Sequence, residues 1–261
     1  MSETPISDTP MSKSANDPFY VGYLPLPKSL APVVKAFVAL GVVAALVFAF
    51  VVSTAQGDPG TGHWDTSKIY EIEGHLTVSP YPIIHVPDAA SPTNTRAVLL
   101  VSGLKFGVED RTKAMHGKRV RATGEFITHQ GRGMFALLDD EDAITVVSDD
   151  STAPATQELG EHTMVGEICD SKCFLGVMKP GSGKTHRGCA VRCISGGIPP
   201  IFVTRDANND ATVYLMVDNE HNAINKAVLP FVAEPVEAQG RLEMQGDLLV
   251  YVVDPTKITR K

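Results

Sequence analysis

The hydrophobic positions of this chain follow two patterns, and the first is one unbroken apolar run near the N-terminus. Residues 36–54 (AFVALGVVAALVFAFVVST) are nineteen positions without a charge. As a helix that rises ~1.5 Å per residue they reach about 28 Å, close to the ~30 Å hydrocarbon core of a bilayer. A buried helix of a soluble domain would carry polar residues over this length. The pattern therefore predicts a transmembrane helix over residues 31–54.

Charges on either side of this run predict its orientation. Lys28 and Lys35 precede it, whereas Asp58 and Asp65 follow it. By the positive-inside rule we expect a single-pass protein of the bacterial inner membrane, with its N-terminus in the cytoplasm and its bulk in the periplasm. The polar residues 1–30 are expected to form a disordered cytoplasmic tail. Because the leader before the apolar run is longer than that of a cleaved signal peptide, the segment is predicted to be a signal anchor.

From residue 69 onwards the second pattern consists of short β-branched and apolar runs between turn residues, which is typical of an all-β domain. A polar stretch over 108–117 predicts a short helix before the fourth strand. Strands arranged in this way indicate a small Greek-key barrel, and the OB fold is the closest member of that group. The predicted fold class is therefore mainly β. The strands predicted in the first half are Tyr70–Val78, Tyr81–His85, Ala97–Val101, Arg119–Ile127, Met134–Leu138 and Ile144–Val147.

The second half of the chain repeats the spacing of the first. Val120-Arg-Ala-Thr-Gly124 matches Val236-Glu-Ala-Gln-Gly240, and each motif precedes a turn with glycine, an apolar strand and an aspartate. Self-similarity of this kind predicts a duplicated domain. After the transmembrane helix we therefore expect two OB-like barrel domains, over 69–148 and 161–261, with linkers over 55–68 and 149–160.

The second copy is longer than the first. Val98 precedes its motif by 22 residues and Val213 precedes its own by 23, so these two positions are expected to correspond. Gly74 precedes Val98 by 24 residues, whereas Gly166 precedes Val213 by 47. The second copy has therefore gained about 23 residues. The gain falls in a Cys-rich insertion over 166–200.

This insertion contains every cysteine of the chain, as two Cys-x-x-x-Cys pairs: Cys169 with Cys173 and Cys189 with Cys193. A four-residue offset puts both side chains on one side of a helix or a strand, so each pair presents two thiols in the same direction. His186 adds an imidazole three residues before the second pair. These groups predict disulfide, metal or redox chemistry.

All three chemistries fit the residues. Two disulfides would staple an insertion with little core of its own, and they are the usual state of paired cysteines outside the cytoplasm; bridges between the pairs are favoured over bridges within them. A metal ion is the alternative, because Cys-x-x-x-Cys with a nearby His suits zinc, and soft thiolates also suit copper(I). A thiol redox site is the third, since nearby cations would favour thiolate, although the familiar Cys-x-x-Cys spacing is missing from the sequence.

The insertion also resembles a family of bacterial exported or membrane-anchored proteins built from OB-fold-like domains, most of them uncharacterised. The mark of this family is Gly-x-[Ile/Val]-x-Asp-x-x-Cys, then His-x-x-Cys and Cys-x-x-x-Cys, which this chain carries from Gly166 to Cys193. The resemblance covers residues 161–261 and, more weakly, 70–148. It implies no established activity, and it implies that Cys169 is an addition to a shared set: Cys173, His186, Cys189 and Cys193.

Cations surround the cysteines, although the whole chain is acidic with a formal net charge of -7. An acidic chain argues against nucleic acid as a partner. A local cationic cluster would instead steer an acidic partner toward the insertion. The cations expected to bind a partner are Lys172, Lys179, Lys184, Arg187 and Arg192.

Other motifs in the sequence are incomplete. PGSGKT at 180–185 resembles a phosphate-binding loop, but Met178 occupies the position of the required first glycine, and no Ser/His/Asp set can be read. We therefore expect a non-enzymatic binding or accessory protein that serves a membrane or periplasmic redox assembly. A metal-binding or electron-transfer protein that uses zinc or copper is the alternative, and a thiol-disulfide oxidoreductase is a more remote one.

Overall fold

The computed structural model describes residues 26–56, 62–91, 93–149 and 152–261, and the chain divides into two compact units, Met1–Asp58 and Pro59–Lys261. In the first unit, helix α1 (Ala31–Ala55) has an 18-residue window with a mean hydropathy of 2.7, and none of its side chains is buried. It is therefore long and apolar enough to span a membrane, where the sequence predicts a span over 31–54. Most of the predicted tail, residues 1–25, lies outside the described residues.

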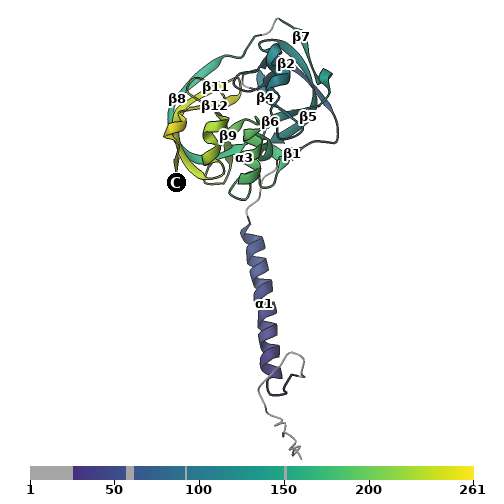
Figure 1. Ribbon diagram of the computed structural model, residues 1–261, viewed down its shortest axis with the longest axis vertical. Helices are drawn as coiled ribbons and strands as arrows, with labels where there is room; N and C mark the ends of the chain where they lie inside the picture. The colour runs from purple at the N-terminus through teal and green to yellow at the C-terminus, as the bar shows by residue number, and fades with distance from the viewer. Residues whose placement is uncertain (1–25, 57–61, 92, 150–151) are drawn as a thin grey trace, which may run out of the picture. The chain divides into compact units, whose positions relative to one another are not determined.

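The second unit, here called the globular part, begins with a closed five-stranded barrel, the first barrel (Figure 1). β2 pairs with β3 and β5, β3 with β4, and β5 with β6, all antiparallel. The parallel pairing of β4 with β6 closes the ring. This strand order, with a helix before the fourth strand, confirms the predicted OB-like fold. The elements are β2 (Tyr70–Thr77), β3 (Ile83–Pro87), β4 (Thr95–Ser102), α2 (Glu109–Thr112), η1 (Lys113–Met115), β5 (Arg119–His129) and β6 (Arg132–Leu137).

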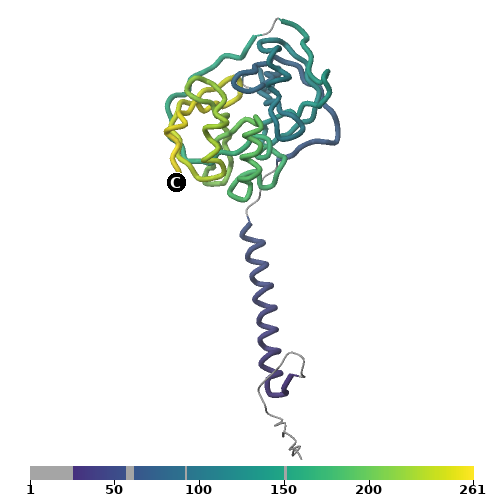
Figure 2. The backbone as a smooth tube through the Cα atoms, in the orientation of Figure 1, coloured from purple at the N-terminus to yellow at the C-terminus, as the bar shows by residue number. Residues whose placement is uncertain are grey.

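The second barrel has the same strand order. β8 pairs with β9 and β11, β9 with β10, and β11 with β12, all antiparallel, and the parallel pairing of β10 with β12 closes the ring. Figure 2 shows the two barrels side by side, the first in blue to teal and the second in green to yellow. The elements are β8 (Thr156–Asp170), β9 (Pro200–Arg205), β10 (Ala211–Val217), α4 (Asn225–Val228), η4 (Leu229–Phe231), β11 (Pro235–Gln245) and β12 (Leu248–Val253).

Short elements complete the sheets. β1 (His63–Trp64) and β7 (Ile144–Ser148) pair with β5, and β13 (Thr259–Arg260) pairs with β11. Two 3-10 turns, η2 (Glu141–Ala143) and η5 (Pro255–Lys257), precede β7 and β13. Because β8 begins at Thr156, the linker between the barrels is shorter than the predicted 149–160. The predicted linker over 55–68 includes β1.

Glycines at matching positions support the duplication. A Cβ added to Gly74 would lie 2.3 Å from the carbonyl oxygen of the neighbouring strand, and one added to Gly166 would lie 2.4 Å from the equivalent oxygen. At Gly124 and Gly240 the corresponding distance is 2.2 Å in both barrels. A side chain cannot occupy such a position, so only glycine allows the strands to approach this closely. The same constraint thus recurs at the same two places in each barrel.

The strand register corrects one expected correspondence. Val101 and Val217 occupy the same position in the parallel pairing of the third and fifth strands. Counting back three residues, Val98 corresponds to Tyr214 rather than to Val213.

The register also locates the extra residues of the second copy. Gly74 lies 11 residues before His85 of the next strand, whereas Gly166 lies 37 residues before its counterpart Val203, so the gain is 26 residues. It falls between the first and second strands of the second barrel.

Three hydrophobic clusters form the core, one inside each barrel and one between them. In β4, Val98 and Leu100 face into the first barrel, whereas Leu99 and Val101 belong to the cluster between the barrels. Strands that are buried on both faces are continuous apolar runs rather than alternating ones, as in AVLLV of β4 and LLVYVV of β12. The two barrels therefore share a buried interface.

A buried histidine distinguishes the first barrel from the second. His85 of β3 is 4% exposed, and its Nδ1 has no hydrogen-bond partner among the described residues. Burial lowers the pKa of His85 to about 4, and the neighbouring His75 acts in the same direction. In the first barrel the residue after Gly74, His75, pairs with His85. In the second barrel the residue after Gly166, Glu167, pairs with Val203. Val203 therefore takes the place of His85 in the second barrel.

We expect this histidine to make the free energy of unfolding fall as the pH falls. The unfolded chain binds a proton at His85 near pH 6.5, whereas the folded chain resists protonation down to about pH 4. The loss accumulates between these two pH values and reaches about 3 kcal/mol at its lower end. His85→Val should remove this part of the difference between urea unfolding curves at pH 7 and pH 4. His162→Gln, at an exposed histidine, is the control, and an unchanged pH dependence in His85→Val would contradict the expectation.

Candidate functional site

The insertion between β8 and β9 carries its chemistry on three consecutive pieces of backbone (Figure 1). Asp170 ends β8, and Cys173 begins the helical turn η3 (Cys173–Val177). Helix α3 (Arg187–Ser195) follows, with His186 at its N-cap position. Its cysteines, four residues apart, lie on one face of the helix. Gly197, with a φ of 98°, allows the chain to leave α3 in a left-handed conformation and return to the sheet.

Three of the four sulfur atoms come together. The Sγ atom of Cys173 lies 3.8 Å from that of Cys189 and 4.0 Å from that of Cys193. Cys173 and Cys193 are buried and Cys189 is half-buried. The predicted disulfides are not present: all four cysteines, each within the described part of the chain, carry free thiols.

Cys169 has different surroundings from the other three. Its buried thiol donates a hydrogen bond to Oε1 of Glu167 at 3.4 Å, and burial raises its pKa well above the ordinary value. It is not among the described side chains whose ligand atoms lie close enough together to hold a metal ion. The structure therefore separates Cys169 from the other cysteines, as the family resemblance implies.

One carboxylate connects the imidazole to a cysteine. Oδ2 of Asp170 lies 2.9 Å from Nε2 of His186, and Oδ1 accepts the backbone N–H of Cys173 at 2.8 Å. Both side chains are buried, with relative exposures of 3% for His186 and 0% for Asp170. Asp170 thus fixes the position of two groups that the sequence proposes as ligands.

A lysine of the first barrel reaches the sulfurs. Lys105, in the loop after β4, places Nζ 2.7 Å from Sγ of Cys189 and 3.6 Å from Sγ of Cys193. The hydrogen bond between Cys173 and Cys193 lowers the pKa of Cys193 and raises that of Cys173, and Lys105 lowers that of Cys193 further. Within this pair, Cys193 is therefore the thiol that ionises first.

Lys172 is buried rather than available to a partner. It is 3% exposed, and its Nζ donates to the carbonyl oxygens of Ser102, Gly103 and Leu104 at 2.6, 2.8 and 2.7 Å. The same atom lies 4.9 Å from the ring centroid of Trp64. Burial lowers the pKa of Lys172 to about 8. This ammonium joins the insertion to the loop of the first barrel, so the prediction that it binds a partner is wrong.

The other four predicted cations divide into two kinds. Arg187 is half-buried and pairs with Glu234, which also binds Nε of Arg260 at 2.7 Å. This cation is therefore already paired within the second barrel, with a carboxylate that it shares with Arg260. The exposed ones are Lys179, Lys184 and Arg192.

The cluster can hold a metal ion. Two groups of side chains have their ligand atoms within 4.8 Å of one another. The first group is Cys173, His186 and Cys189, and the second is Asp170, Cys173 and Cys193. Cys173 is common to both groups.

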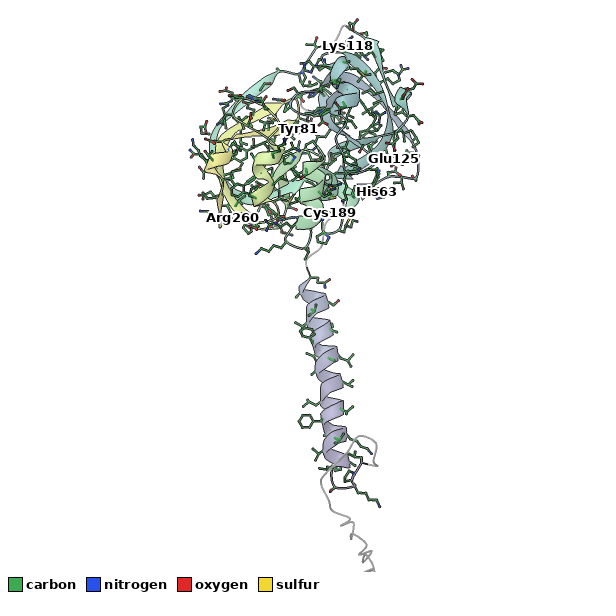
Figure 3. All side chains as sticks on the ribbon, viewed as in Figure 1. His63, Tyr81, Lys118, Glu125, Cys189 and Arg260 are labelled. Atoms are coloured by element: carbon green, nitrogen blue, oxygen red, sulfur yellow. The ribbon has the colours of Figure 1, made fainter. Side chains whose placement is uncertain are left out.

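Sequence reasoning missed Lys105 and gave Asp170 no role. Asp170 could have been found, because it is the Asp of the family pattern. Lys105 carries no local signal, since 84 residues separate it from Cys189. The sequence also carries no sign that β1 packs against η3. Gly176 of η3 lies so close to His63 of β1 that a Cβ added to Gly176 would be 2.7 Å from the backbone nitrogen of His63. Figure 3 labels His63 of β1 and Cys189 of α3.

Comparisons of the chain with protein families, with curated proteins and with solved structures each find no match.

Proposed function

We propose that this chain is a metal-binding protein, anchored in the bacterial inner membrane by α1, with its globular part in the periplasm. The ion is zinc or copper(I), held by Cys173, His186, Cys189 and Cys193. The observation that carries the proposal is the position of Cys173 of η3, whose sulfur lies 3.8 and 4.0 Å from those of Cys189 and Cys193 of α3. A ring nitrogen of His186, at the N-cap of α3, lies within 4.8 Å of the sulfurs of Cys173 and Cys189.

The spacing of the sulfur atoms supports a tetrahedral ion. Thiolates ~2.3 Å from a tetrahedral zinc lie about 3.8 Å from one another. The two distances from Cys173, 3.8 and 4.0 Å, are close to this value. A disulfide would need the sulfurs at ~2.05 Å. The thiols are therefore spaced for an ion between them.

The contact between Asp170 and His186 supports the same assignment. A histidine that binds a metal usually donates its other ring N–H to a carboxylate, which fixes the tautomer. With the proton on Nε2, facing Asp170, the lone pair of His186 is on Nδ1. Nδ1 is then the atom that would bind the ion.

Charge balance is also favourable. Three thiolates around a divalent zinc leave a net charge of about −1. The ammonium of Lys105, 2.7 Å from Cys189, offsets this charge and donates a hydrogen bond to a sulfur. The buried ammonium of Lys172 adds a second positive charge near the cluster.

Four protein ligands leave no position for a substrate. Structural zinc sites are closed in this way, whereas catalytic ones keep one position open. This supports a non-enzymatic role, and together with the anchor and the expected export we propose an accessory protein of a membrane or periplasmic redox assembly. The lipid bilayer is its first partner.

Elemental analysis tests the proposal directly. The full chain, purified in detergent, should contain about one zinc or copper ion per chain and bind Co²⁺ with the intense visible absorption of a tetrahedral thiolate site. Thiol counting of the same sample should find no disulfide. Two disulfides without metal would contradict the metal assignment and leave only the accessory role.

A dithiol redox role is the second candidate. It is favoured by the lowered pKa of Cys193, to which its hydrogen bond with Cys173 and the nearby Lys105 contribute, since the thiolate is the reactive form. Reversible oxidation of Cys173 with either neighbouring cysteine, in a protein that contains no metal, would support this role instead.

A further inference from the structure

We propose that the rim of the cysteine site is a second contact with the membrane, which binds the surface of an anionic bilayer independently of α1. This inference rests on the anchoring proposed above. The rim is formed by two loops and by one residue of helix α3, and its residues are Leu104, Lys105, Phe106, Met178, Lys179, Lys184 and Arg192.

Both loops of the rim border the thiols. The loop after β4 carries Lys105, whose Nζ contacts Cys189, and its backbone carbonyls bind Lys172. The loop after η3 begins at Met178, whose N–H donates to the carbonyl of Cys173 at 3.2 Å. The two loops come from different barrels but meet at the same cluster.

Large apolar side chains are exposed on this rim. Leu104 is 67% exposed, Phe106 is 48% exposed and Met178 is 44% exposed. Among the described residues of the globular part, the other exposed large hydrophobics are valines or isoleucines of the strands and their flanks: Ile69, Val146, Val147 and Val165. The rim therefore exposes the longer apolar side chains at loop tips, from which they can reach into another phase.

Cations alternate with these apolar tips. Lys105 lies between Leu104 and Phe106, and Lys179 follows Met178. Lys184 and Arg192 add two further exposed positive charges. Apolar side chains that enter the boundary between headgroups and acyl chains, with Lys and Arg at the level of the phosphates, are the chemistry of interfacial membrane binding.

The path of the chain indicates lipid rather than an acidic protein as the occupant. Gly62, the first described residue of the globular part, packs against Leu175 and Gly176 of η3, where an added Cβ would lie 2.8 and 2.9 Å from their backbone atoms. The polypeptide that leaves α1 thus enters the globular part at the cysteine segment. In the sequence only residues 57–61 separate this edge from Gln56, so the chain tethers this edge of the globular part to the phase that holds α1, which on the anchoring proposed above is a bilayer.

Tryptophan quenching by brominated lipids tests the proposal on the full chain. Trp64 is the only tryptophan, so Trp64→Phe gives a silent background for Phe106→Trp on the rim and for Val147→Trp on β7 as the matched control. The proteins are reconstituted into phosphatidylglycerol and phosphatidylcholine vesicles with brominated acyl chains. We expect the rim tryptophan to be quenched at least about twofold more strongly than the control.

The charge contribution has its own variants. Lys179→Glu, Lys184→Glu and Arg192→Glu together, or vesicles of phosphatidylcholine alone, should reduce the quenching at the rim, because each cation near an anionic surface adds to binding. Equal quenching at the rim and at the control position, in a chain that floats with the vesicles and contains metal, would overturn this proposal alone, and an acidic protein would then be the better occupant. A chain that does not float with the vesicles would overturn both the anchor and the docking.

Discussion

Cys173→Ser is expected to weaken metal binding by at least ~100-fold. The sulfur of Cys173 lies within 4.0 Å of both other sulfurs in the cluster, so it is shared by every candidate ligand group. Binding free energies of about 10–16 kcal/mol for four-ligand zinc sites correspond to about 3 kcal/mol per ligand, which is roughly two orders of magnitude in affinity. Competition with a chromophoric chelator measures this change.

Cys169→Ser is the matched control for this experiment. It removes a thiol four residues away, and serine keeps a donor for the hydrogen bond to Glu167. Its metal affinity should stay close to that of the wild type. If Cys169→Ser and Cys173→Ser lost metal equally, the assignment of the ligand set would be wrong.

Asp170→Asn is expected to reduce metal affinity by about 10–100-fold, although Asp170 itself is not a proposed ligand. The carboxylate accepts a hydrogen bond from the N–H at Nε2 of His186. An amide whose NH₂ faces Nε2 would instead donate to it, which moves the imidazole proton to Nδ1 and removes the lone pair that binds the ion. The same chelator competition measures the loss.

Asp139→Asn, at an exposed aspartate, should leave the affinity unchanged. A structural role of Asp170 would lower the free energy of unfolding of the metal-free protein as well as the affinity. If Asp170 orients His186, the binding free energy for the metal should fall by more than the free energy of unfolding of the metal-free protein. An unchanged affinity in Asp170→Asn would contradict the proposed use of Nδ1.

Much of the fold could be predicted because local patterns are strong in this chain. Nineteen positions without a charge can form only a long apolar helix, and short runs with turn residues between them predict the strands of both barrels. Gly124 and Gly240 occupy matching positions because each lies against a carbonyl oxygen of the adjacent strand, where no other residue fits. The duplication can therefore be detected from these glycines. The start of β8 at Thr156 was not predicted, because residues 156–160 are mostly polar and their strand conformation depends on pairing with β11.

The candidate site was predicted only in part. The sequence identifies the thiols and His186 but leaves disulfide, metal and redox chemistry open, since spacing along the chain does not determine the distances between sulfur atoms. Lys172 illustrates the limit. In the sequence it is indistinguishable from the four other cations of the insertion. It is buried because its ammonium donates to the backbone carbonyls of Ser102, Gly103 and Leu104, and this contact exists only in the folded chain.

Three features follow from the order of residues alone: an apolar helix long enough to cross a bilayer, a duplicated mainly β architecture, and the segment that contains the cysteines and His186. These features depend on residues that are close along the chain, so composition and period are enough to reveal them. Three others require the folded chain: the approach of Cys173 to Cys189 and Cys193 while Cys169 stays apart, the contact of Asp170 with His186, and the contact of Lys105 of the first barrel with the thiols. These relations join residues up to 88 positions apart, and the packing of one barrel against the other creates them.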